Sequence, residues 1–132
     1  MKTYKLNDLN NPLISVLMPA YNAEKYIKEA IESILNQTFS NFEFIIIDDG
    51  SIDATEEIIK SFKDSRIVYI KNEKNLGLIK TLNKGISIAR GEFIARMDSD
   101  DISMPQRFEL QLDVFKKYKG VDIVNVSIKK SV

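Results

Sequence analysis

Short apolar runs alternate with amphipathic segments along this chain, and that alternation limits its fold more than any other feature. Each run is five or six residues long and mostly apolar, as is typical of a strand that is covered on both faces of its sheet. The runs are residues 14–18, 42–47, 66–70, 93–97 and 121–126.

The segments between the runs carry apolar residues at helical spacing and predict four amphipathic helices. Asn22 is predicted to be the N-cap of the first helix, and Asp53 with Glu56 has the spacing of a capping box for the second. The fourth helix is expected to run from beyond Pro105 to about Tyr118. The side chains expected to face the core are Tyr26, Ile27, Ala30, Ile31, Ile34, Leu35, Ile58, Ile59, Phe62, Ile79, Leu82, Ile86, Ala89, Phe108, Leu112 and Phe115.

Together these elements predict an α/β protein with a mostly parallel sheet, helices on both faces and right-handed crossovers. At 132 residues the chain is about one domain, and no repeat, low-complexity stretch or Gly/Ser-rich linker divides it. Residues 1–12 are polar and are expected to form an N-terminal arm, with residues 13–132 forming the domain.

Composition excludes several kinds of function. Nineteen basic and nineteen acidic side chains cancel, so no overall field attracts nucleic acid. The absence of cysteine and histidine removes disulfides, zinc-finger sites and histidine-based acid/base catalysis, and a bound metal would be a hard, oxygen-ligated cation such as Mg²⁺ or Mn²⁺. With no hydrophobic signal region and no apolar run of about 20 residues, a cytoplasmic location is expected.

Three carboxylates, those of Asp98, Asp100 and Asp101, follow directly on the run at 93–97. Ligands bind at the carboxyl ends of strands in a parallel sheet, and carboxylates this close repel one another unless they share a cation. Asp98 and Asp100 would point to opposite sides of an extended chain unless it turns there, so one is expected to ligate a metal and the other to serve a ribose or a metal-bound water. The alternative is a solvated acidic turn that caps the next helix.

Two further motifs are expected at the same edge of the sheet. After the first run, Tyr21 beside Pro19 is suited to stack on a planar base, or it merely closes the core. After the second run, the carboxylate of Asp48 or Asp49 can accept a hydrogen bond from a pyrimidine N3–H, or residues 48–51 form an ordinary turn. The joint placement of three such motifs on one edge favours a binding site over three unrelated turns.

Six segments together resemble the motifs of family 2 glycosyltransferases, which have the GT-A fold. The resemblance covers about residues 13–118. The segments are residues 14–22 (ISVLMPAYN), 34–39 (ILNQTF), 44–51 (FIIIDDGS), 75–77 (NLG), 83–85 (NKG) and 91–105 (GEFIARMDSDDISMP).

The resemblance implies a nucleotide-sugar donor, often a UDP-sugar, and inverting transfer of its sugar to an acceptor hydroxyl in surface polysaccharide or glycoconjugate synthesis. Pro19, Tyr21 and Asp49 match positions that hold the base, and Asp100 matches the position that binds the divalent cation, Mn²⁺ or Mg²⁺. The residues expected to bind the nucleotide are Pro19, Tyr21, Asn22, Asp49, Lys80 and Asp98, and those expected to bind the metal are Asp100 and Asp98.

The chain departs from the family pattern in two respects. Residues 81–83, Thr-Leu-Asn, stand where many members have Ala-Arg-Asn with an arginine that reaches the donor. Lys80 is a candidate substitute and Arg96 another cation that could assist a diphosphate, although exposed cations are usually only solvated. Family members are also longer, so the chain is expected to be an N-terminal, donor-binding portion whose acidic general base lies beyond Val132.

The expected acceptor is a glycan or a lipid-linked glycan. Peripheral membrane association of the full-length protein and a dimer through an exposed sheet edge are further hypotheses. The alternative function is a non-catalytic, flavodoxin-like signalling or interaction module with a Mg²⁺-dependent phospho-acceptor site. Modules of that kind place their acidic pair after the first strand, where this chain has Pro19-Ala20-Tyr21-Asn22.

Overall fold

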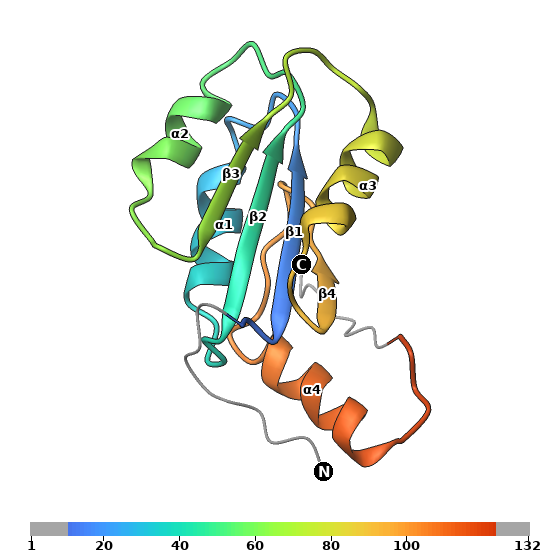
Figure 1. Ribbon diagram of the computed structural model, residues 1–132. Helices are drawn as coiled ribbons and strands as arrows, with labels where there is room; N and C mark the ends of the chain where they lie inside the picture. Colours follow the sequence, from blue (N-terminus) through green and yellow to red (C-terminus); the bar gives the residue numbers. More distant parts are fainter. Residues whose placement is uncertain (1–10, 124–132) are drawn as a thin grey trace, which may run out of the picture.

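A computed structural model describes residues 11–123 of the chain, and strands alternate with helices throughout that range (Figure 1). The elements are β1 (Ile14–Ala20), α1 (Ile27–Leu35), β2 (Phe42–Asp48), α2 (Thr55–Ser61), β3 (Ile67–Lys71), α3 (Leu78–Ile88), β4 (Phe93–Arg96) and α4 (Arg107–Lys117). The predicted α/β alternation is confirmed. The predicted strand at 121–126 lies half outside the described residues, and residues 121–123 have no regular secondary structure. The predicted arm at 1–12 lies mostly outside them.

The four strands form one sheet in the order β3-β2-β1-β4, and every pair of neighbours is parallel. β1 pairs with β2 along its whole length, from Ile14 opposite Phe42 to Ala20 opposite Asp48, and with β4 on its other side. The chain thus moves outward from β1 to β3 and then returns to the opposite side of β1. The carboxyl ends of strands next to such a reversal form the usual binding crevice of an α/β sheet.

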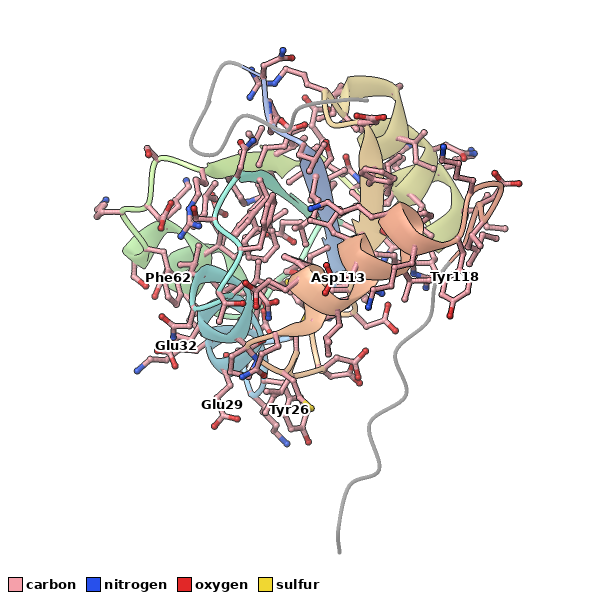
Figure 2. The ribbon with its side chains drawn as sticks, turned by 90° about the horizontal axis from the view of Figure 1, so that it is seen from below. Tyr26, Glu29, Glu32, Phe62, Asp113 and Tyr118 are labelled. Atoms are coloured by element: carbon pink, nitrogen blue, oxygen red, sulfur yellow. The ribbon has the colours of Figure 1, made fainter. Side chains whose placement is uncertain are left out.

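The main hydrophobic core lies between one face of the sheet and the helices α1, α2 and α4. Ile27 and Ile34 of α1 are fully buried there. Phe42 of β2 packs edge to face on Phe108 of α4, with ring centroids 5.6 Å apart. These contacts confirm the inner faces predicted for the first, second and fourth helices, except for Tyr26. That tyrosine precedes α1 and is 58% exposed at the outer surface (Figure 2).

The opposite face of the sheet is covered by α3, and the predicted inner face of this helix is only half right. Leu82 and Ala89 pack against the sheet as expected. Ile79 and Ile86, which were expected to be buried with them, are 76% and 52% exposed.

Gly85 explains why α3 is turned in this way. The buried residues of the helix are Thr81 and Gly85, and Gly85 lies directly against Leu17 of β1. A Cβ added to this glycine would come within 2.1 Å of Cδ1 of Leu17. The missing side chain lets helix and sheet approach closely along this line, and Ile79 and Ile86 are consequently turned toward solvent.

Candidate functional site

The structure brings the three predicted motifs to one edge of the sheet. Tyr21 follows β1, Asp49 follows β2 and Asp98 comes shortly after β4. Because β1 lies between β2 and β4, the motif after β1 has one of the other two on each side. The backbone N–H of Asp49 donates to the carbonyl oxygen of Ala20 at 2.8 Å, which joins the first two motifs directly.

Tyr21 stands at this edge with its side chain half exposed. Its exposed fraction is 51%, so the alternative in which the ring closes the core is wrong. Pro19 is still within β1, opposite Ile47 of β2, and is itself half-buried. A half-exposed aromatic ring beside a rigid strand end offers a face on which a planar ligand can stack.

Asn22 joins two loops instead of capping a helix, so its prediction as the N-cap of α1 is wrong. Its φ of 48° lies in the left-handed region, which Asn tolerates better than most residues. Its backbone N–H donates to Oγ of Ser51 at 2.9 Å, and its Oδ1 accepts the N–H of Ile52 at 3.0 Å. These bonds hold the loop after β1 against the loop after β2, and α1 begins only at Ile27.

The capping box predicted for α2 is also absent. Oδ1 of Asp53 accepts both the N–H and the hydroxyl of Thr55, and its Oδ2 accepts the N–H of Glu24 from the neighbouring loop. Glu56 instead forms ion pairs with Lys60 and Lys71, which lower its pKa to about 2. Asp53, like Asn22, therefore holds the loop after β1 against the loop after β2.

The two aspartates that follow each other at the end of β2 have different partners. Asp48 is fully buried, and its Oδ1 accepts the N–H of Ser51 at 2.9 Å, as in the ordinary turn that was the alternative. The carboxylate of Asp49 is nearly buried and accepts the backbone N–H groups of Leu76 at 2.8 Å and Gly77 at 3.1 Å. Asp49 therefore fixes the loop between β3 and α3.

A buried polar network around Asn72 supports Asp49, and no local pattern of residues predicts it. The side-chain N–H groups of Asn72 donate to Oδ1 of Asp49 at 2.9 Å and to Oγ1 of Thr81 at 3.2 Å. Oδ1 of Asn72 accepts the ammonium of Lys84 at 2.8 Å. Burial acts to raise the pKa of Asp49, but the hydrogen bonds from Leu76, Asn72, Gly77 and Thr81 outweigh it and hold that pKa below its usual value. The carboxylate is ionised at neutral pH.

The two candidate cations lie apart from this network. Lys80 is exposed on α3, and within residues 11–123 its ammonium has no hydrogen bond or ion pair. Arg96 is at the end of β4, with its Nη2 3.4 Å from Oδ1 of Asp98. The structure therefore does not bring Lys80 into contact with either acidic motif, and its role at a diphosphate stays a prediction.

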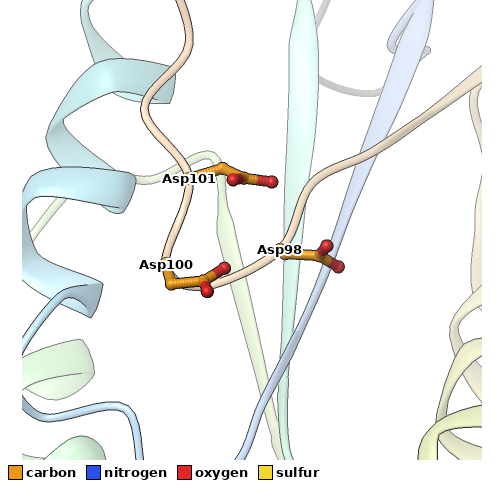
Figure 3. Close-up of side chains that lie close together, drawn as sticks. All are labelled: Asp98, Asp100 and Asp101. Carbon is orange, nitrogen blue, oxygen red and sulfur yellow. The ribbon is translucent and has the colours of Figure 1, made fainter. Parts of the chain in front are cut away.

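Asp98, Asp100 and Asp101 converge on one side of a tight turn. The N–H of Asp101 donates to the carbonyl oxygen of Asp98 at 3.1 Å and closes the turn. One carboxylate oxygen from each of the three lies within 4.8 Å of the others, and all three side chains are exposed. Figure 3 shows the carboxylate of Asp100 extending toward Asp98. The turn thus brings together the two aspartates that an extended strand would separate, and it adds Asp101.

This donor set suits a hard divalent cation. Carboxylate oxygens are the protein ligands that Mg²⁺ and Mn²⁺ prefer, and such ions keep several positions for water or for ligand phosphates. The exposure of the cluster leaves those positions open.

Comparison with known proteins decides the family. The model of the family described as glycosyl transferase family 2 matches residues 15–131, nearly the whole chain. The chain belongs to glycosyl transferase family 2. This confirms the resemblance seen in the motifs and gives no support to the flavodoxin-like alternative.

Two relatives illustrate the match. An uncharacterized glycosyltransferase of Methanocaldococcus jannaschii, MJ1057, is 46% identical over 90% of this chain and 42% of its own length. WfgD of Escherichia coli, a UDP-Glc:α-D-GlcNAc-diphosphoundecaprenol β-1,3-glucosyltransferase, is 37% identical over 89% of this chain and 49% of its own. The chain therefore spans less than half the length of these family 2 relatives.

Solved structures agree with the family assignment. Staphylococcus aureus TarS in complex with UDP superimposes with a TM-score of 0.74 and 27% identity, over 85% of this chain and 38% of that one. Its complex with UDP-GlcNAc gives a TM-score of 0.75 at the same identity, over 85% of this chain and 37% of that one. The parallel four-stranded sheet with its helices thus has the predicted GT-A architecture. Within residues 11–123 the structure contains no helix that could cross a bilayer.

Proposed function

We propose that this chain binds a nucleotide-sugar donor, a UDP-sugar, together with Mn²⁺ or Mg²⁺. It would form the donor half of an inverting glycosyltransferase in surface polysaccharide or glycoconjugate synthesis. The observation that carries the proposal is the placement of Tyr21, the network of Asp49 and the acidic turn around the end of β1, where the strand order reverses. Family 2 membership and the UDP complexes of TarS support it.

We assign the base, the ribose and the diphosphate of the donor to different residues at this edge. We assign the base to the ring of Tyr21, beside Pro19, and its N3–H to the carboxylate of Asp49. Asp98 would serve the ribose or the cation. The predicted contacts of Asn22 and Lys80 with the nucleotide stay predictions.

Transfer by in-line displacement leaves negative charge on the departing nucleoside diphosphate. A cation held by Asp100 with Asp98 would stabilise that charge and align the diphosphate. The chain's own part is to hold the base and ribose so that the sugar is presented in one orientation. We place the acidic general base outside residues 11–123. The acceptor is proposed to be a glycan on a lipid carrier, as in the reaction named for WfgD, met by a cytoplasmic enzyme at the membrane surface.

A matched pair of tyrosines tests the base-binding assignment. Calorimetric titration in the presence of Mn²⁺ should show UDP binding to the wild-type chain. Tyr21→Ala should weaken binding by about 5- to 150-fold, which corresponds to the loss of one aromatic stacking contact. Tyr26→Ala removes a comparably exposed ring from the outer surface and should leave UDP binding unchanged. Equal affinities of all three proteins would refute the assignment of Tyr21.

A further inference from the structure

The two ends of the acidic turn are buried and lie next to each other. Met97 precedes the turn and Ser103 follows it, and both side chains are buried. The backbone N–H of Met97 donates to the carbonyl oxygen of Leu17 at 3.0 Å, which anchors the first end to β1. The hydroxyl of Ser103 lies 3.1 Å from Sδ of Met97, so the two ends touch. Residues 98–102 between them form a closed loop that carries all three carboxylates.

Arg107 of α4 bridges the two ends of this loop. Its Nη1 donates to Oγ of Ser103 at 3.0 Å, and its Nη2 donates to the carbonyl oxygen of Arg96 at 2.9 Å. One planar guanidinium therefore holds the last residue of β4 and the first buried residue after the loop at a fixed separation.

Gln37, just beyond the end of α1, fixes the same segment from the other side. Its side chain is buried, and its Nε2 donates to the carbonyl oxygens of Met104 at 2.6 Å and Ser33 at 3.1 Å. Its Oε1 accepts the N–H of Phe108 at 3.2 Å. Oγ of Ser33 also accepts the N–H of Ser103 at 3.0 Å. Gln37 belongs to the segment 34–39 of the family resemblance, and together with Ser33 it holds the chain where it returns from the acidic loop.

We infer that Arg107 and Gln37 are positioning residues for the cation site, because they keep the acidic loop closed so that its three carboxylates converge. The inference rests on the function proposed above. Three like charges repel one another, and an unclamped loop would spread them when no cation is bound. When the ends of the loop are fixed, the folded structure already holds the carboxylates together against their repulsion. Cation binding then does not have to supply that free energy.

The measurement that tests this is the gain in UDP affinity on adding Mn²⁺, determined by calorimetry with and without the ion. Arg107→Gln, Arg107→Lys and Gln37→Ala should each reduce the gain about tenfold or more, the size of effect usual for groups that orient metal ligands. UDP affinity without metal should change much less than this gain, since none of these residues touches Tyr21 or Asp49 and only Asp98, within the loop that they close, is a candidate for a direct contact with the ribose. Lysine should not substitute for arginine, because a single ammonium cannot bridge Ser103 and the Arg96 carbonyl.

Two exposed neighbours serve as matched controls. Lys117→Gln removes a positive charge from the same helix, and Gln106→Ala truncates a glutamine that is exposed next to Arg107. Both should keep the full gain, and circular dichroism at the assay temperature confirms that each variant is folded. A full gain in folded Arg107→Gln and Gln37→Ala would overturn the inference and leave the cation site standing. Absence of any gain in the wild type would overturn the cation site itself.

Discussion

Replacing Asp49 by alanine is expected to lower the free energy of unfolding by about 3–5 kcal/mol. The change leaves the N–H groups of Leu76 and Gly77 and one side-chain N–H of Asn72 without their acceptor, in a nearly buried position. Hydrogen bonds to a charged acceptor are worth more than neutral ones, and a buried donor without a partner is costly. The loop between β3 and α3 should loosen, and UDP binding should be lost with it. Urea denaturation and calorimetry measure the two effects.

Two further variants, Asp49→Asn and Asp113→Ala, show whether the loss of stability comes from the lost hydrogen bonds of Asp49. The asparagine keeps the size of the side chain and one acceptor oxygen, so its stability should fall between wild type and Asp49→Ala. Asp113 is exposed on α4, and its removal should change stability by less than about 0.5 kcal/mol. If Asp49→Ala proved as stable as Asp113→Ala, the network around Asn72 would not hold the loop.

Glu43→Gln is expected to cost about 2–4 kcal/mol of stability at neutral pH. Glu43 is buried near the amino end of β2, a central strand of the sheet, and accepts the hydroxyl of Ser15 at 2.5 Å. It also accepts the backbone N–H of Arg90 at 2.6 Å and its Nε–H at 3.1 Å. The hydroxyl of Ser15 in turn accepts the N–H of Gly91 at 2.8 Å. One carboxylate therefore ties the connection between α3 and β4 to the sheet.

The contribution of the Glu43 carboxylate to the free energy of unfolding should decrease at low pH. Burial acts to raise the pKa of Glu43, but the hydrogen bonds from Ser15 and Arg90 and the charge of Arg90 outweigh it, so the pKa lies below the ordinary 4.5. A depressed pKa stabilises the fold fully above about 4.5 and progressively less as pH falls through the folded value. Glutamine does not titrate, so the gap between wild type and Glu43→Gln should narrow below that pH.

Urea denaturation from pH 7 to pH 3.5 measures this gap. Glu73→Gln, which changes an exposed side chain of the β3–α3 loop, is the control and should change stability by less than about 0.5 kcal/mol at neutral pH. A gap for Glu43→Gln that stays constant over the whole range would show that ionisation of Glu43 does not support the fold.

The four strands of the structure and three of its helices follow from periodicity, because apolar runs and i, i+3, i+4 patterns report which side chains must be buried. The strand predicted at 121–126 has no such confirmation. The exception, α3, shows the limit of that reasoning. Ile79, Leu82, Ile86 and Ala89 form a regular stripe, but a helix can approach a sheet more closely through a glycine than through isoleucine, and Gly85 decides which side faces inward. A pattern of apolar side chains does not show the effect of Gly85, which acts through having no side chain.

The position of the site could be predicted for a simple reason: the carboxyl ends of parallel strands meet at one edge, so residues that follow strands are brought together. The polar side chains that support the site could not be predicted. Asn72 bonds to Asp49 across 23 residues, and Gln37 bonds to Met104 across 67. Polar partners so far apart in sequence have no spacing rule, and only the packed fold shows them. Local spacing predicts that Asn22 and Asp53 cap helices. Their actual partners, Ile52 and Glu24, lie about 30 residues away and connect two loops.

Whether a nucleotide and a cation bind together at this edge can be measured in one comparison. UDP is titrated into the wild-type chain and into Asp100→Asn by calorimetry, with and without Mn²⁺. We expect Mn²⁺ to raise the wild-type affinity by about tenfold or more, equivalent to about 1.4 kcal/mol, and to have no such effect on Asp100→Asn. The metal-free affinities should be equal, because Asp100 is not assigned to the base. The same gain in both proteins would show that Asp100 does not hold the cation beside the nucleotide.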